Sequence, residues 1–99
     1  MQANDSQTLV LSALADGPKH GYAINNAIEE LTGARLGAGS LYGALSRLEA
    51  KGLIETLEEQ GRRRPVQLTP AGREVLEQEL RAMARVATTG LRNLGIRLT

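Results

Sequence analysis

The segment from Leu36 to Leu68 constrains the fold more than any other part of the chain. Apolar residues recur there at positions i, i+3, i+4 and i+7, which predicts a short helix with one buried stripe. This stripe comprises Leu41, Ala44, Leu45 and Leu48. The opposite side of the helix, from about Ala38 to Lys51, has no acidic residue at its front end. It comprises Gly39, Tyr42, Gly43, Ser46 and Ala50, with Arg47 on its flank. Such a small, polar surface lets another molecule approach closely.

A basic hairpin is predicted directly after this helix. Gly52 fits a left-handed cap, and Leu53 can fold back onto the helix. The segments LIETLEEQ and PVQL then read as two strands joined by the turn GRRR. Pro65 cannot donate to a strand ladder, so its strand is expected at an edge. An outward helix followed by a hairpin with an arginine tip is the arrangement of a winged helix-turn-helix.

Two further helices are predicted before this segment. The run TLVLSALA is apolar nearly all round and follows the capping candidates Asn4, Asp5 and Ser6, so it predicts a deeply buried helix. A second helix is expected from about His20 or Gly21 to Leu31. Its inner stripe is predicted to be Ile24, Ala27, Ile28 and Leu31, with Asn25, Asn26, Glu29 and Glu30 facing outward. The segment 34–36 is a candidate for a single extended stretch that pairs with the hairpin.

The last helix is expected to begin at Pro70, with Thr69 as its N-cap. Its apolar residues follow spacings of 4, 3 and 4, which is typical of a helix that pairs with another helix. Burial inside one protomer is the alternative. We expect a dimer interface in which the first helix also takes part: Leu9, Leu76, Leu80, Met83, Ala87, Leu91 and Leu94. The predicted domains are therefore a DNA-binding unit, residues 1–69, and a dimerisation helix, residues 70–99.

The composition excludes several classes of function. The chain of 99 residues has no cysteine and one histidine, His20, so no metal or cofactor is expected. No phosphate loop or catalytic nucleophile pattern is present, so an enzyme is not expected. No apolar run approaches the roughly 20 residues of a membrane span, and MQANDSQT lacks the features of a signal peptide. A cytoplasmic protein, nucleoid-associated when bound to DNA, is expected.

The candidate DNA contacts lie on the outward helix and the hairpin tip. They are Ser40, Tyr42, Gly43, Ser46, Arg47, Lys51, Arg62, Arg63 and Arg64. Each has a structural alternative: the arginines can form a solvated turn, Tyr42 can pack under the wing, and Arg47 can pair with a nearby glutamate. Ser40 can cap the helix or bind a phosphate. Gly43 is either a tolerated small residue or bare backbone that DNA approaches. His20 and Tyr22 are expected to fix the start of the second helix and its packing on the first.

Three stretches in order, LADGPKHGYAINNAIEELTG, SLYGALSRLEAKGLI and LTPAGREVL, resemble the PadR family of bacterial transcriptional regulators. The resemblance covers about residues 8–85 and points to the compact subfamily with a short C-terminal helix. It implies a winged helix-turn-helix, mainly α with a small β-hairpin wing (α+β), and a two-fold dimer. It also implies binding to a roughly palindromic operator, usually as a repressor.

The sequence therefore predicts a homodimeric repressor that binds double-stranded DNA, with a small-molecule effector as a further possible partner. The alternative is a winged helix used for protein–protein interaction, in which the arginine tip is inessential.

Overall fold

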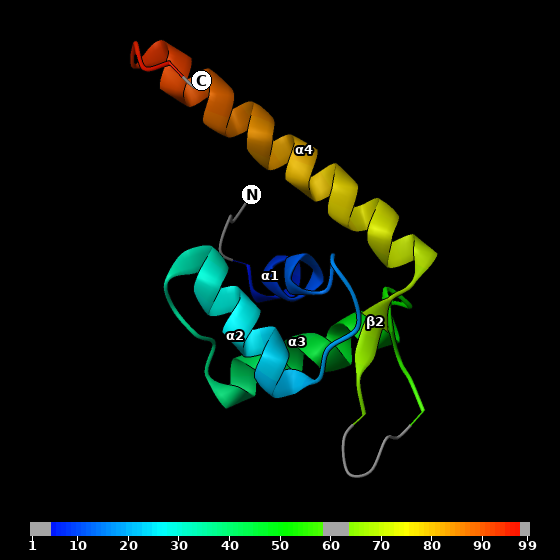
Figure 1. Ribbon diagram of the computed structural model, residues 1–99. Helices are drawn as coiled ribbons and strands as arrows, with labels where there is room; N and C mark the ends of the chain where they lie inside the picture. Colours follow the sequence, from blue (N-terminus) through cyan, green and yellow to red (C-terminus); the bar gives the residue numbers. More distant parts are fainter. Residues whose placement is uncertain (1–4, 59–63, 98–99) are drawn as a thin grey trace.

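The computed structural model describes residues 5–58 and 64–97, which form four helices and one hairpin (Figure 1). The elements in chain order are α1 (Ser6–Ala13), α2 (Gly21–Thr32), α3 (Ala38–Ala50), β1 (Ile54–Thr56), β2 (Val66–Leu68) and α4 (Pro70–Asn93). The predicted fold class, mainly helical with a small β-hairpin wing, is confirmed. Helix α4 extends beyond the other elements (Figure 1), and the molecule measures 52 × 26 × 22 Å.

Helix α1 is the centre of the core, as its continuous apolar sequence predicts. It lies between α4 on one side and α2 and α3 on the other (Figure 1). The Asp5 carboxylate caps it by accepting from the Gln7 N–H (2.9 Å). Val10 and Leu14 are fully buried, and Ile24, Ile28 and Leu48 pack into the same cluster. A small helix buried on several sides thus organises a core that contains no aromatic ring.

Two residues of α2 differ from the prediction in their exposure. Asn25 was expected to face outward, but it is only 8% exposed. Its amide donates to the Leu36 carbonyl and accepts from the Leu36 N–H, both at 2.8 Å, so it supplies the partners that this non-helical backbone needs. Leu31, assigned to the inner stripe, is 59% exposed because the last turn of α2 extends past the core.

The end of α3 has the predicted left-handed cap. Gly52 has φ of +75°, and its N–H donates to the Glu49 carbonyl, while the Leu53 N–H donates to the Leu48 carbonyl. This pair of bonds is the Schellman motif. It turns the chain sharply, so the hairpin starts within a few residues of the end of α3.

The segment that pairs with the hairpin differs from the predicted one. Ile54 pairs with Leu68 and is the buried residue of β1. Residues 34–36 do not pair with the hairpin. Instead Lys19 exchanges two backbone hydrogen bonds with Val66, at 2.8 and 3.0 Å. Val66 therefore has a partner on both sides. Among the described residues the sheet consists only of β1 and β2, so β2 is still an edge strand, as Pro65 predicts.

The start of α4 is fastened to the end of α3. The Thr69 hydroxyl accepts from the Gly72 N–H (3.0 Å), as an N-cap does, and donates to the Gly52 carbonyl (2.7 Å). The Thr69 N–H donates to the Leu53 carbonyl (3.1 Å). A Cβ atom at Gly72 would lie 1.9 Å from that same carbonyl oxygen. Only glycine permits so close an approach, and we call this cluster of Gly52, Leu53, Thr69 and Gly72 the helix joint.

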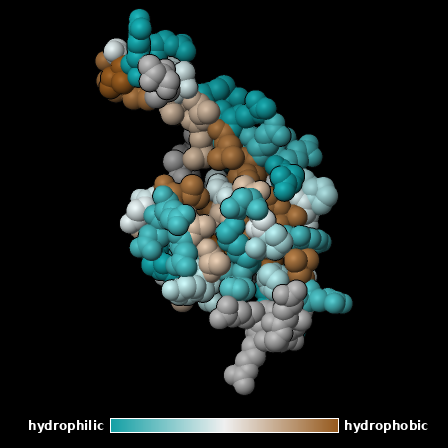
Figure 2. All heavy atoms as spheres, viewed as in Figure 1, coloured by the Kyte–Doolittle hydropathy of each residue, from teal (hydrophilic) through white to brown (hydrophobic). Residues whose placement is uncertain are grey.

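Helix α4 continues without a break through the segment 88–90. It ends in a second Schellman motif, in which Gly95 has φ of +80° and the Ile96 N–H donates to the Leu91 carbonyl. Leu76 is buried in the core, whereas Leu80 is 43% and Leu94 75% exposed. Hydrophobic side chains gather along one side of α4 and hydrophilic ones along the other (Figure 2).

Replacement of Gly72 by alanine is expected to lower the free energy of unfolding by about 3 kcal/mol, because the new methyl group collides with backbone that cannot move alone. Urea denaturation followed by circular dichroism measures the change. Gly90→Ala is the control, since nothing lies within 4 Å of its new methyl group and alanine favours a helix by up to ~1 kcal/mol. Equal stability of the two variants would show that the helix joint is not tightly packed.

Candidate nucleic-acid interface

The outer face of α3 is formed by small and polar residues. Ser40, Tyr42, Ser46 and Arg47 are exposed, and Gly43 is partly covered. Gly37 is the N-cap and offers no side-chain hydrogen bond, and no acidic residue lies in the first turn. Ser40 is the third residue of the helix and does not cap it. The free N–H groups at this end therefore favour an approaching anion.

Two side chains of this face rest against glycines. A Cβ atom at Gly21 would lie 3.0 Å from the Tyr42 hydroxyl, so the tyrosine lies against the first residue of α2. It is nevertheless 59% exposed. A Cβ atom at Gly43 would lie 3.3 Å from Arg47 Nη1, so the arginine folds back over the bare backbone. Among residues 5–58 and 64–97, Arg47 forms no ion pair, and the predicted alternative of a glutamate partner does not occur.

A groove of about 240 Å³ separates α3 from the wing. Tyr42, Ser46 and Arg64 contribute polar side chains to it, and Leu45, Ile54 and Val66 form apolar parts of its wall. Two carboxylates near the groove are held by neutral partners. Glu49 accepts from the Thr56 hydroxyl (2.8 Å), and Glu55 accepts from the Gln67 amide (2.7 Å). Arg62 and Arg63, predicted as DNA contacts, lie outside the described residues.

Lys51, also predicted as a DNA contact, is turned toward α1. Its ammonium group donates to Gln7 Oε1 at 2.7 Å, which ties the end of α3 to the first turn of α1.

The residues at the start of α2 only partly follow the prediction. His20 is the N-cap of α2 by its backbone. Tyr22 was expected to pack on the first helix, but it is 73% exposed. Its ring lies beneath the Arg35 guanidinium, with 5.6 Å between Arg35 Cζ and the ring centre. Nearby, the Lys19 ammonium hydrogen-bonds Asp16 and holds the pKa of that carboxyl below its ordinary value.

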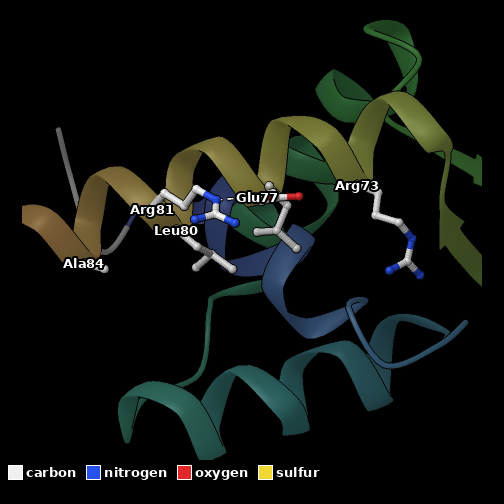
Figure 3. A pocket seen from close by; sticks show the side chains of 6 residues that line it. Arg73, Glu77, Leu80, Arg81 and Ala84 are labelled. Atoms are coloured by element: carbon white, nitrogen blue, oxygen red, sulfur yellow. Dashed lines mark hydrogen bonds and ion pairs between the residues drawn. The ribbon is translucent and has the colours of Figure 1, made fainter.

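The exposed part of α4 carries most of the predicted interface residues. Leu80, Ala87 and Leu94 are exposed, and Met83 and Leu91 are partly buried. A shallow groove of about 480 Å³ runs along one side of the helix. Figure 3 shows Leu80 and Ala84 beside it, and Arg81 paired with Glu77 (2.8 Å). Leu9 and Leu76 belong to the protomer's own core, at 8% and 4% exposure, and leave little surface for a partner.

Within the described residues, no group of three histidine, cysteine or acidic side chains could hold a metal ion. None of the helices in that part of the chain is long and apolar enough to cross a membrane.

Three contacts that position this surface were not predicted from the sequence. Gly21 lies against Tyr42, Lys19 pairs with Val66, and Gly72 lies against the Leu53 carbonyl. A signal for Gly72 was available, because glycine stands at the third helical position, where a capping box would carry glutamate. No local signal marks Gly21 or Lys19. Their roles depend on which distant residues, Tyr42 and Val66, the fold brings against them.

The elements and their surfaces define a winged helix-turn-helix with an extended C-terminal helix. The model of the PadR-like transcriptional regulator family matches residues 10–78. The chain therefore belongs to the PadR-like family, whose members are transcriptional regulators and not enzymes.

Two individual proteins agree with this assignment. The chain is 37% identical over 81 residues to transcriptional regulator Rv3488 of Mycobacterium tuberculosis, covering 79% of this chain and 75% of that protein. It is similar to the crystal structure of a PadR family regulator from Clostridium difficile, with 32% identity, a TM-score of 0.70, and coverage of 87% and 97%. It is also 68% identical over 87 residues to a 37.1 kDa protein in transposon TN4556 of Streptomyces fradiae. That match covers 88% of this chain but only 25% of the longer relative.

Replacement of Gly43 by alanine separates the two interpretations of this glycine. We expect the free energy of unfolding to rise by up to ~1 kcal/mol, because only the flexible end of Arg47 must move. We also expect DNA affinity to fall roughly tenfold, the order of one lost base contact. Urea denaturation and fluorescence anisotropy measure the two effects. Gly90→Ala, far from α3, is the control for the gain in stability alone. Unchanged DNA affinity would mean that Gly43 is merely tolerated.

Proposed function

We propose that this regulator is a homodimeric DNA-binding protein that acts as a repressor on a roughly palindromic operator. The front half of α3 enters the major groove, and the wing contacts the flanking backbone. The outer face of α3 is the observation that carries the proposal. It presents Tyr42, Gly43, Ser46 and Arg47 together, with no acidic residue in its first turn and with Arg64 across the groove.

The chemistry of this face suits DNA. Arg47 has no ion-pair partner in the described residues and can reach guanine or a phosphate. The hydroxyl groups of Tyr42 and Ser46 can donate to phosphates, and the tyrosine ring can contact a thymine methyl group. Glu49 lines the groove between α3 and the wing, where its carboxylate accepts from the Thr56 hydroxyl, and the Glu55 carboxylate accepts from the Gln67 amide.

The dimer is proposed from the outer half of α4. Leu80, Met83, Ala87, Leu91 and Leu94 repeat at helical spacing, yet no element within residues 5–58 and 64–97 covers them fully. Water contact with so many apolar groups on one helix is unfavourable, and burial against a second copy removes it. A two-fold pair of winged helices then presents two α3 helices to half-sites about one DNA turn apart.

The proposal is tested by fluorescence anisotropy with the protein's own upstream DNA and a scrambled duplex, over a series of salt concentrations. A preference of roughly a thousandfold or more, with two protomers per site, is expected for a specific regulator. Weak binding that ignores sequence and vanishes at physiological salt would contradict it and favour a protein-interaction module.

Replacement of Arg62, Arg63 and Arg64 by alanine is expected to weaken binding to all duplexes nearly equally, because backbone contacts carry no sequence information. The slope of log K against log salt concentration should fall by up to about one unit per lost phosphate contact. The triple alanine replacement of Glu74, Glu77 and Glu79 on α4 is the control and should leave that slope unchanged. An unaltered slope in the arginine variant would remove the wing from the interface.

Replacement of Leu80 and Met83 by glutamate is expected to give monomers, since like charges would meet at the centre of the proposed interface. Sedimentation measures the oligomeric state, and circular dichroism verifies that helix content persists. The matched control places glutamate at Ala71 and Gln78, which are exposed on α4 and outside the predicted interface residues. A double variant that stays dimeric would place the interface elsewhere.

A further inference from the structure

We propose that Thr69, acting with Gly72, is a positioning residue that fixes the angle between α4 and α3. It thereby sets the separation of the two α3 helices in the dimer. This inference rests on the homodimer proposed above. It adds a residue that touches neither the DNA nor the partner, but on which the DNA-reading geometry depends.

The hydroxyl group of Thr69 joins the two helices directly. It accepts from the Gly72 N–H of α4 and donates to the Gly52 carbonyl, which directly follows α3. Gly52 and Leu53 are themselves fixed to α3 by the two bonds of its Schellman motif. The cap that ends one helix and the cap that begins the other therefore share a single side chain.

Two backbone contacts add rigidity to the helix joint. The Leu53 carbonyl accepts from the Thr69 N–H (3.1 Å) and lies so close to Gly72 that a Cβ atom there would be 1.9 Å away. Pairing of Ile54 with Leu68 closes the ring of contacts on the wing side. Movement of the first turn of α4 relative to Gly52 and Leu53 would break at least one of these contacts.

The length of α4 makes this angle important. The helix has 24 residues, which is about 36 Å at 1.5 Å per residue. A tilt of about 5° at the helix joint displaces its far end by about 3 Å, close to the rise of one base pair. The exposed apolar residues lie on this outer part, beyond Leu76. A tilt of this size would therefore change the α3 separation by about one base pair.

Thr69→Asp and Thr69→Ser separate this role from ordinary helix capping. Aspartate is a good N-cap and still accepts from the Gly72 N–H, but an ionised carboxylate cannot donate to the Gly52 carbonyl. Serine keeps both bonds. Thr69→Ala removes both and extends the series. A merely structural cap would make the aspartate variant resemble the parent protein.

The chain contains no cysteine, so Ala50→Cys, on the exposed end of α3, places one spin label on each protomer. Pulsed dipolar electron paramagnetic resonance then measures the distribution of distances between the two α3 helices. We expect the parent and Thr69→Ser distributions to coincide. Thr69→Asp should broaden the distribution or displace its maximum by about 3 Å or more, and Thr69→Ala should change it at least as much.

Ile28→Ala, in the buried part of α2 on the other side of α1 from α4 (Figure 1), is the control for loss of stability away from the helix joint and should leave the distribution unchanged. A Thr69→Asp distribution equal to that of the parent would overturn the inference while leaving the dimer intact. Absence of a dipolar signal from the labelled parent would instead overturn the homodimer, and with it this inference.

Discussion

The approach of Gly72 to the Leu53 carbonyl is the constraint on which the arrangement of the other elements depends. The contact is possible only without a side chain at residue 72, and it brings the first turn of α4 against the chain that leaves α3. Leu76, one turn later, then enters the core beside α1. The same contact fixes where the hairpin leaves and returns, because Ile54 and Leu68 pair immediately beyond it. The helix α3, the hairpin and the helix α4 are thus oriented from one point.

The candidate DNA surface depends on glycines as much as on its polar side chains. Gly21 lets the Tyr42 hydroxyl lie against the first turn of α2, and Gly43 leaves room for Arg47 to fold over α3. These contacts place the Tyr42 and Arg47 side chains without burying them, so both can turn toward another molecule. Glycine in a helix costs up to ~1 kcal/mol relative to alanine. That cost is consistent with a surface kept bare for approach, although a tolerated small residue remains the alternative at Gly43.

Features determined by neighbouring residues could be predicted from the sequence. The left-handed cap at Gly52, the N-cap at Thr69 and the buried stripe that includes Leu48 all depend on spacing within a few residues, and the structure has them. Features determined by tertiary contacts could not. Asn25 is polar at a position that faces outward on the helical wheel, yet it is buried because the loop at Leu36 folds back onto it. The pairing of Lys19 with Val66 likewise has no local pattern.

The candidate site also combines features set by neighbouring residues with features set by tertiary contacts, and α4 illustrates the difference. Its apolar spacing predicts a face but not what covers each residue. The structure divides that face at about Leu80: Leu76 is buried in the protomer, and Leu94, near the end of the helix, is 75% exposed. The chain has no phenylalanine or tryptophan, so its small aliphatic core has few contacts to lose. In the proposed dimer, burial of the outer half of α4 would therefore stabilise this helix. The first turn of the same helix sets the orientation of α3. Dimerisation and DNA reading would then be coupled through the helix joint, with no need for a separate relay.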